Sequence, residues 1–274
     1  MSHVLYKQYD PLVLKKLQGV QTQMLKDVLD VCEKYNLPCF LIYGTAIGAV
    51  RHKGFIPWDD DIDVHMPADD YIKFLKLFKE KNKNDDYFLQ TIETEKYYHA
   101  TFAKIRKNHS CMVEKDWSYM KIHKGINIDI FPLYPYPDNQ NDRRKFRFLL
   151  KLSTLLVSKN NKTSSIKNKI VFGILRVIPR KVTNKWSSNI IYKLLNYRGT
   201  YSKYITEACE VGYDREWFDN STKLEFEGTK YNVPSGYDSV LTSCYGDYMT
   251  PPKVEDRTGH GDIILSFDKN YEEL

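Results

Sequence analysis

Ile56-Pro-Trp-Asp-Asp-Asp-Ile-Asp-Val64 is the stretch of sequence from which the fold and the chemistry can be argued. Four of its residues are aspartates, and they stand beside apolar residues that we expect to be partly buried. Asp61 and Asp63 are two apart at the start of a predicted strand, so their side chains point to the same side. Carboxylates that converge in such surroundings repel each other unless a cation neutralises them. The pattern therefore predicts a site for Mg²⁺ or Mn²⁺, which take oxygen ligands.

Asp129 is the expected third carboxylate of this site. It lies in a predicted strand over residues 125–131, where its two neighbours are isoleucines that point to the opposite side. An aspartate within such an apolar strand is costly unless it is paired. It joins Asp61 and Asp63 if the two strands are neighbours in the sheet.

A segment suited to phosphate binding precedes the acidic stretch. It is expected to fold as a short strand, a glycine turn and a short helix, and a basic pair follows. Backbone N–H groups at a helix start bind phosphate, and an arginine can grip it with two hydrogen bonds. Two further basic residues alternate along a later strand. The residues expected to contact the substrate in this way are Gly44, Thr45, Arg51, His52, Lys104 and Arg106.

The remaining patterns predict an α+β fold, with a mixed sheet flanked by helices and an additional, mainly helical lobe. Apolar residues at three- and four-residue steps indicate helices, and alternating apolar residues indicate strands. We expect helices over residues 12–35, 46–50 and 69–81, and strands over residues 39–43, 62–66, 87–92, 101–106, 111–114 and 125–131.

The second half of the chain is predicted to be less regular. Residues 132–137 are rich in proline and are expected to cross from one part of the protein to the next. Residues 141–196 read as helical with a polar gap at 158–168, and a hairpin is expected around Glu227-Gly228, before a short helix within 233–247. We divide the chain into a catalytic core (1–137), a basic helical lobe on the acceptor or membrane side (138–200) and a C-terminal segment that packs back on the core (201–274).

The composition is that of a folded protein without a disulfide framework. The chain has 274 residues, of which 42% are hydrophobic and 14% aromatic, enough for one catalytic domain with an appended lobe. The five cysteines are scattered and form no C-x-x-C pair, which favours a reducing, cytoplasmic setting. We expect no secretory signal, and no apolar run approaches the roughly 20 residues that cross a bilayer.

The net charge of +6 hides an asymmetry. Residues 141–185 carry thirteen Lys or Arg and one acid, Asp142, so this stretch is +12 and the remainder of the chain is −6. A basic stretch with apolar neighbours fits either a solvated face or an anionic membrane surface. A nucleic-acid-binding protein is an alternative from a different class. The stretch lacks an interleaved aromatic platform and the acidic cluster repels phosphate, so we expect no nucleic-acid partner.

Three segments of the sequence together resemble the LicD family. Gly44-Thr-Ala-Ile-Gly-Ala-Val-Arg-His52, followed by Gly54-Phe-Ile-Pro-Trp-Asp-Asp-Asp-Ile-Asp-Val64, is similar to the signature of that family. Asn127-Ile-Asp-Ile-Phe-Pro-Leu133 and Tyr245-Gly-Asp-Tyr-Met-Thr-Pro-Pro252 are similar to its two other landmarks. The segments stand in the right order between about residues 30 and 260, whereas residues 141–200 carry no motif that matches.

The resemblance implies a nucleotidyltransferase-like fold in which Asp61 and Asp63 bind the metal and Asp129 is the third carboxylate. It also implies transfer of phosphocholine, or a similar phospho-alcohol, from CDP-choline or another CDP-alcohol to a hydroxyl of a cell-surface glycan, with release of CMP. Lipopolysaccharide and teichoic acid are glycans of this kind. Relatives of the family include the fukutin-type ribitol-phosphate transferases. The acceptor is expected to be lipid-linked or free, and the enzyme cytoplasmic, with peripheral contact at the inner face of the membrane left open.

In the mechanism that this implies, a sugar hydroxyl attacks the choline-bearing phosphorus. Asp129 or Asp59 accepts or orients the hydroxyl proton, and the metal and nearby cations stabilise the charge. Choline's quaternary ammonium is expected to rest on aromatic faces, for which the candidates are Trp58, Tyr43, Trp117 and Tyr245. The alternative from the same chemistry is a true nucleotidyltransferase, which moves NMP from an NTP to a small molecule or sugar and releases pyrophosphate.

Overall fold

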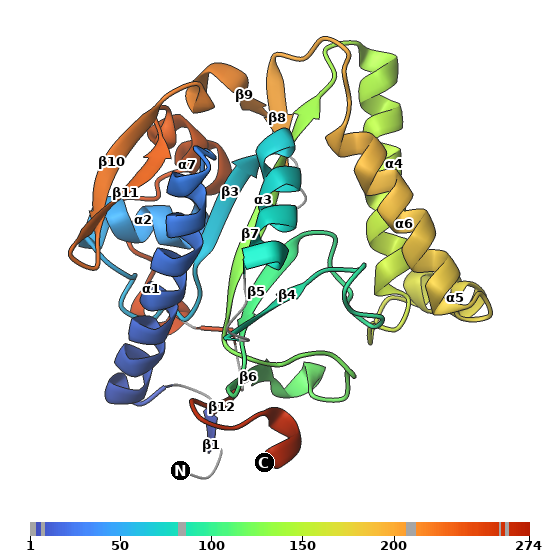
Figure 1. The fold of residues 1–274 in the computed structure, drawn as a ribbon. Helices are drawn as coiled ribbons and strands as arrows, with labels where there is room; N and C mark the ends of the chain where they lie inside the picture. The colour runs from blue at the N-terminus through green and yellow to red at the C-terminus, as the bar shows by residue number, and fades with distance from the viewer. Residues whose placement is uncertain (1–3, 7–8, 82–85, 207–211, 258, 261–262) are drawn as a thin grey trace.

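A mixed sheet forms the centre of the molecule and confirms the predicted α+β fold (Figure 1). The computed structural model describes residues 4–6, 9–81, 86–206, 212–257, 259–260 and 263–274. The sheet runs in the order β2-β3-β7-β5-β4, and β8 and β9 extend it beyond the far end of β7. Its strands are β2 (Phe40–Leu41), β3 (Asp63–Pro67), β4 (Tyr87–Gln90), β5 (Ala103–Lys107), β7 (Asn127–Tyr136), β8 (Lys203–Ile205) and β9 (Tyr213–Asp214).

The register of the three middle strands places charged residues side by side. β3 runs parallel to β7 and pairs Asp63 with Asp129. β5 runs antiparallel to β7 on its other side and pairs Lys104 with the same Asp129. The two acidic strands are therefore neighbours, which is the condition under which Asp129 was expected to join Asp61 and Asp63.

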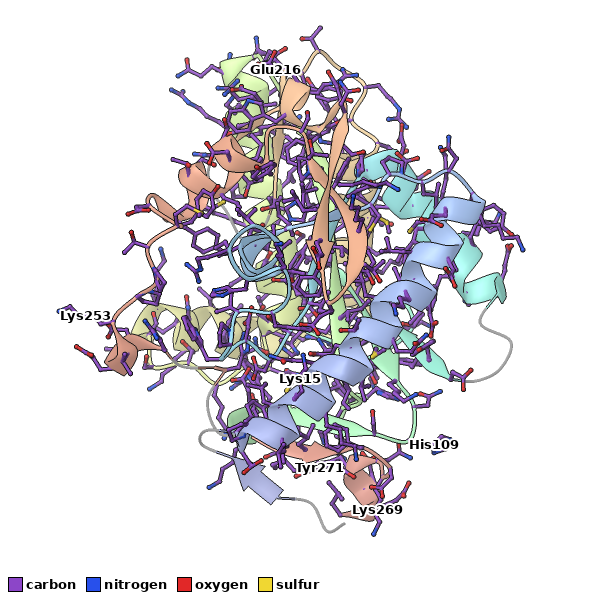
Figure 2. All side chains as sticks on the ribbon, turned by 90° about the vertical axis from the view of Figure 1, so that its left-hand side faces the viewer. Lys15, His109, Glu216, Lys253, Lys269 and Tyr271 are labelled. Atoms are coloured by element: carbon purple, nitrogen blue, oxygen red, sulfur yellow. The ribbon has the colours of Figure 1, made fainter. Side chains whose placement is uncertain are left out.

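Helices cover the sheet, and two of the predicted ones are confirmed to within one residue. They are α1 (Pro11–Lys34) and α3 (Ala68–Lys81). The Asp10 carboxylate caps α1 by accepting hydrogen bonds from the backbone of Leu12 and Val13. Figure 2 shows α1, with Lys15, lying across the face turned to the viewer.

The strand expected over residues 39–43 is shorter than predicted. Only β2 pairs with β3, and the chain turns at Tyr43 into α2 (Tyr43–His52), so the expected helix starts three residues early. Tyr43 has a φ of 50°, a left-handed conformation that costs a non-glycine residue about 1–2 kcal/mol. The early start places Gly44 and Thr45 in the first turn of the helix.

The predicted proline crossing at 132–137 is wrong, because these residues continue β7 as far as Tyr136. All ten residues of β7 are buried, so burial on both faces outweighs the hydrogen bonds that proline cannot donate. Beyond the end of β3, β7 pairs Tyr134 and Tyr136 with β8. The same strand thus begins at the acidic residues and ends beside the helical lobe.

Three helices form the lobe, and the predicted polar gap separates the first two. α4 packs along α6, and α5 lies at the outer end of the pair, away from the sheet (Figure 1). Asn139 and Ser165 cap α4 and α5 with their side-chain oxygens. Among the described residues no helix is long and apolar enough to cross a membrane. The helices are α4 (Gln140–Ser158), α5 (Ile166–Arg176) and α6 (Arg180–Leu195).

The C-terminal segment returns to the core at several places. The predicted hairpin is β10 (Ser221–Phe226) and β11 (Thr229–Pro234), joined by Glu227-Gly228 with φ of 48° and 75°. Short elements stand before and after the hairpin in the sequence, and Figure 2 shows Glu216 and Tyr271, from two of them, at opposite ends of the molecule. The remaining elements are β1 (Val4–Tyr6), β6 (Cys111–Glu114), β12 (Ile263–Ser266), α7 (Tyr237–Tyr245), η1 (Lys115–Trp117), η2 (Arg215–Phe218), η3 (Val254–Asp256) and η4 (Tyr271–Glu273).

A second small sheet ties both described ends of the chain to the core. β12 lies between β1 and β6 and runs antiparallel to each. Its strands join residues near both ends of the sequence with the segment that precedes β7. The division into core, lobe and C-terminal segment stays an interpretation, since β8, β9 and β12 of the C-terminal segment share sheets with strands of the core.

Candidate active site

A pocket of about 480 Å³ opens above the middle of the sheet, where six parts of the chain meet. The start of α2, the loop before β3, β3 itself, β7, the end of α7 and the segment before β12 each contribute side chains. Carboxylates occupy one part of the pocket and aromatic rings another. The lining residues are Tyr43, Gly44, Asp59, Asp61, Asp63, Asp129, Phe131, Cys244, Tyr245 and His260.

Polar side chains of α1 donate hydrogen bonds to the backbone of the acidic loop before β3. The sequence analysis did not single out these side chains. Gln21 is fully buried and donates to the backbone carbonyls of Asp60 (2.8 Å) and Asn127 (3.2 Å). Gln18 donates to the carbonyl of Asp59 (3.0 Å). These hydrogen bonds satisfy buried carbonyls and fix the loop against β7.

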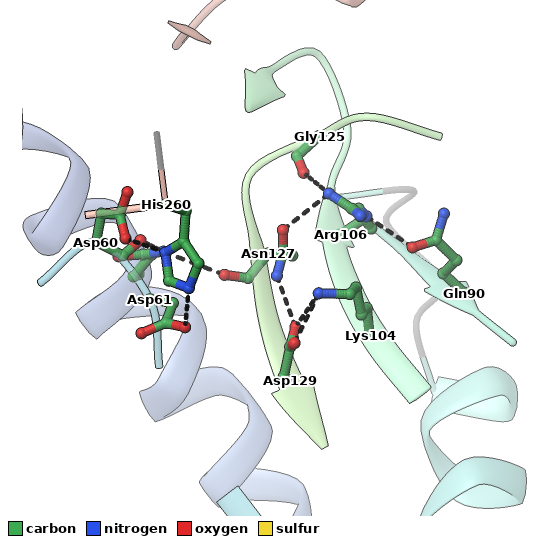
Figure 3. Close-up of polar contacts among 10 residues, drawn as sticks. Asp60, Asp61, Gln90, Lys104, Arg106, Gly125, Asn127, Asp129 and His260 are labelled. Atoms are coloured by element: carbon green, nitrogen blue, oxygen red, sulfur yellow. Dashed lines mark hydrogen bonds and ion pairs between the residues drawn. The ribbon is translucent and has the colours of Figure 1, made fainter. Parts of the chain in front are cut away.

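Lys104 holds Asp129 in place on the neighbouring strand. Its ammonium group donates to Asp129 Oδ1 at 2.8 Å and to Oδ2 at 2.6 Å, and the Asn127 amide also donates to Oδ1 at 2.6 Å. Arg106, which is buried, donates to Asn127 Oδ1, to the carbonyl of Gly125 and to Gln90 Oε1. Arg106 therefore orients Asn127, which in turn orients Asp129 (Figure 3).

His260 is a site residue that the sequence analysis missed. Its Nδ1 lies 2.5 Å from Asp60 Oδ1, and its Nε2 lies 3.4 Å from Asp61 Oδ2 (Figure 3). These contacts, led by the hydrogen bond to Asp60, raise the pKa of His260 to about 10. In the sequence, the feature that could have indicated this residue is a histidine between two glycines. A Cβ on Gly259 would lie only 3.2 Å from Asp60 Oδ2, so the position before His260 favours glycine.

Burial and mutual repulsion raise the pKa values of the carboxylates in the pocket. Burial, followed by repulsion from Asp61 and Asp60, raises the pKa of Asp59 to about 8. Burial also raises the pKa of Asp61, and raises that of Asp63 well above its ordinary value, with repulsion from other carboxylates adding to it. Lys104 and His260 oppose these shifts without cancelling them. At neutral pH the carboxylates would gain from a further cation.

The donor set fits a hard divalent cation. Carboxylate oxygens are the ligands that Mg²⁺ and Mn²⁺ prefer. Among the described residues, one group of three, Asp60, Asp61 and His260, brings ligand atoms within 4.8 Å of one another. The second oxygen of Asp60 is buried and has no hydrogen-bond partner there, which is costly for a carboxylate. Asp63 and Asp129 offer further oxygens to the same pocket.

Three aromatic residues line the same pocket as these acids. Tyr43 and Phe131 meet edge to face, with ring centroids 5.7 Å apart, and both line the pocket. The Tyr43 hydroxyl lies 2.8 Å from Thr206 Oγ1, which fixes the ring. Tyr245 is half-exposed at the end of α7 and forms another wall. Of the aromatic residues considered from the sequence, Tyr43 and Tyr245 reach the pocket.

Comparison with known proteins gives a relative that aligns with nearly the whole chain. It is the lipopolysaccharide cholinephosphotransferase LicD of Haemophilus influenzae, 31% identical over 263 residues, which span 91% of this chain and 96% of the relative. A family model described as LicD/FKTN/FKRP, nucleotidyltransferase domain, matches residues 36–149. The chain belongs to the LicD family.

Shorter matches are found in two Rickettsia proteins without a described function. The one from Rickettsia typhi is 40% identical over 55 residues, 20% of this chain and 18% of the relative. The one from Rickettsia prowazekii is 38% identical over 55 residues, 20% of this chain and 21% of the relative. The LicD model matches the segment that contains Asp61, Asp63 and Asp129, whereas His260 and Tyr245 lie outside it.

The structure distributes the LicD-like residues predicted to contact substrate over several environments. Gly44 lines the pocket, and a Cβ there would lie 2.7 Å from Asp59 Oδ2, so glycine leaves room for that carboxylate. The Thr45 hydroxyl accepts a hydrogen bond from the backbone N–H of Asp63 (2.9 Å) and positions the strand. Lys104 lies beside the pocket through its pair with Asp129.

The other predicted contact residues do not line the pocket. Arg51, at the end of α2, donates to the carbonyl of Tyr248 (2.7 Å), and His52 is exposed beside it. The ring of Trp58 lies under the guanidinium of Arg257, 4.8 Å from its centroid. Arg106 is buried and donates a hydrogen bond to Asn127. Trp117 stacks on His99.

Proposed function

We propose that this protein transfers phosphocholine from CDP-choline to a hydroxyl of a cell-surface glycan and releases CMP. The observation that carries the proposal is the coincidence of two features in one pocket: buried carboxylates with raised pKa values, and aromatic rings that line the same pocket. The relative that aligns from end to end is named as a lipopolysaccharide cholinephosphotransferase, which supports lipopolysaccharide as the acceptor class.

The aromatic walls suit the choline end of the donor. A quaternary ammonium binds to the faces of aromatic rings and cannot donate hydrogen bonds, so rings and nearby carboxylates recognise it. Tyr43, Phe131 and Tyr245 supply the rings. A donor that carries ribitol or glycerol would offer hydroxyls instead and would leave these rings without a cation.

The phosphate end of the donor is assigned to the start of α2 and to the acidic residues. The first N–H groups of a helix have no partner within it and favour an anion, and Tyr43 and Gly44 bring them to the pocket wall. We propose that Asp61 and Asp63, with Asp129 as the third carboxylate, hold Mg²⁺ or Mn²⁺. A bound cation of this kind neutralises the phosphates and the charge that develops on the leaving group.

Asp59 is our candidate for the group that accepts the proton of the attacking hydroxyl. Its pKa of about 8 makes it a stronger base than an ordinary carboxylate. Asp129 already accepts hydrogen bonds from Lys104 and Asn127, which makes it the weaker candidate. The acceptor oxygen bonds to the choline-bearing phosphorus, the bond from that phosphorus to the oxygen of CMP breaks, and CMP leaves with the electron pair.

We also propose that the protein works in the cytoplasm and meets a lipid-linked acceptor at the inner face of the membrane. Cys32, Cys39 and Cys111, three buried cysteines of the described part of the chain, form no disulfide, as expected for a reducing compartment.

The test is a donor panel with Mg²⁺: CDP-choline, CDP-ribitol, CDP-glycerol and the four NTPs, each with and without purified lipopolysaccharide and EDTA. We expect CMP and choline-labelled lipopolysaccharide from CDP-choline, and no product in EDTA. Pyrophosphate from an NTP would replace the proposal by nucleotidyl transfer. CMP from CDP-ribitol or CDP-glycerol, with CDP-choline inert, would keep the reaction class and exclude choline.

A further inference from the structure

Helix α5 exposes an apolar ridge that nothing in the described structure covers. Ile166, Ile170, Ile174 and Val177 are 75%, 61%, 64% and 82% exposed. They follow one another at steps of four, four and three residues, so they share one face of the helix. Every strongly exposed isoleucine among the described residues lies on this ridge.

The opposite face of α5 explains why the ridge points outward. Phe172 is buried and packs into the lobe. Lys159, at the end of α4, donates through its ammonium group to the carbonyls of Leu175 and Ile178, and Arg176 donates back to the carbonyl of Lys159. These contacts fix one end of α5 on α4, so its orientation is set by the fold.

Basic residues border the ridge, and no acid lies near it in the sequence. Lys167 and Lys169 are exposed on either side of the isoleucines around the helix. Residues 143–206, which include all of α5 and α6 and most of α4, contain sixteen Lys or Arg and neither Asp nor Glu. An isolated apolar patch suits many partners, but one framed by cations alone complements a surface that is both apolar and anionic.

We propose that α5 is an interfacial anchor that places its isoleucine ridge into an anionic lipid bilayer. The eleven-residue helix would lie in the plane of the headgroups, with the ridge among the acyl chains and Lys167 and Lys169 at the phosphates. It is far too short to span a bilayer, in agreement with the lack of any spanning helix among the described residues. The proposal concerns a surface outside the pocket and does not depend on the donor.

The experiment is flotation of the full-length protein with vesicles of phosphatidylcholine, with and without phosphatidylglycerol as the anionic lipid. We expect binding only when phosphatidylglycerol is present, and a fall with added salt because the lysines are screened. Ile170→Ser combined with Ile174→Ser should weaken binding by roughly tenfold or more, and Lys167→Gln with Lys169→Gln by less.

Leu12→Ser is the matched control, because Leu12 is a single exposed aliphatic residue (82%) on α1, outside the lobe. It should leave vesicle binding unchanged, and circular dichroism should show all variants folded. Equal binding to neutral and anionic vesicles, or binding that survives the double isoleucine substitution, overturns the proposal. A dimer that the same substitution separates, seen by light scattering, assigns the ridge to a second copy, and retention of DNA or RNA by the wild type would assign the lobe to nucleic acid.

Discussion

The pocket and the helical lobe use charge in opposite ways. In the pocket, carboxylates from distant segments are buried together, and their pKa values rise first because burial desolvates them and then because each repels the others. In the lobe, most basic side chains project into solvent from neighbouring turns of local helices. Crowded, desolvated charges are costly and are retained where a ligand or reaction needs them. Dispersed surface charges cost little and act mainly by attracting a partner.

Asp61→Asn tests the pocket side of this contrast most strongly. Asp61 belongs both to the compact group with Asp60 and His260 and to the predicted metal set. We expect kcat to fall roughly 10³-fold, since a preorganised charge at the reacting phosphate is lost. CMP release under saturating donor measures it. Asp30→Asn, an exposed acid on α1, is the control and should retain full activity. Robust turnover by the Asp61 variant would remove Asp61 from the chemistry.

Arg106→Met tests whether a buried cation supports the pocket. Its removal leaves acceptors on Gln90, Gly125 and Asn127 without their donor, which should cost about 3 kcal/mol of unfolding free energy. Urea denaturation measures this. Arg198→Met is the matched change after α6, where an exposed guanidinium pairs with Asp69, and should cost less than about 1 kcal/mol. Equal losses of unfolding free energy in the two variants would contradict the expectation that the buried cation contributes more than the exposed one.

His260→Gln should give a pH-dependent loss of stability. The hydrogen bond to Asp60 raises the folded-state pKa of His260 to about 10, above the unfolded value of about 6.5. Protonated His260 therefore stabilises the fold fully below the unfolded pKa, and this contribution is lost as the pH rises through the folded pKa. The difference in Tm between wild type and variant should be largest below about pH 6.5 and should vanish above about pH 10. A difference in Tm that stays constant over this pH range would show that the hydrogen bond between His260 and Asp60 is not its cause.

Asp59→Asn should have the smallest effect on the fold, and in the opposite direction. The pKa of Asp59 is raised to about 8, so the ionised carboxylate destabilises the metal-free protein increasingly as the pH rises from the unfolded pKa of about 4. The variant should melt higher than wild type at pH 8 in EDTA, by roughly 2–4 °C for each kcal/mol of repulsion removed. Mg²⁺ should reduce that gain, and a variant that melts lower would show that Asp59 is stabilised by contacts rather than strained.

Helices and turns were predictable from the sequence where the signal is local. Repeating apolar steps gave α1 and α3 closely, and Glu227-Gly228 gave the hairpin. The prolines of β7 misled the prediction, because burial on both faces is decided by segments that pack later in the chain. A local rule for proline cannot include that burial.

The site was predictable only in part, for a similar reason. Asp61, Asp63 and Asp129 could be grouped because a strand pattern fixes the direction of each side chain. His260 is 200 residues from Asp60 and lies in a segment without a period, so no pattern connected them. Lys104 and Arg106 looked alike in the sequence, yet one pairs with Asp129 beside the pocket and the other is buried beneath it.

The small sheet of β1, β12 and β6 gives the first residues of the chain an unexpected influence. β12 starts three residues after His260, and β1 forms one of its two edges. A change that displaces β1 therefore weakens the pairing of β12, the strand that follows His260. In practice, an N-terminal affinity tag or truncation that disturbs β1 would also disturb β12, and through it the position of His260 in the pocket.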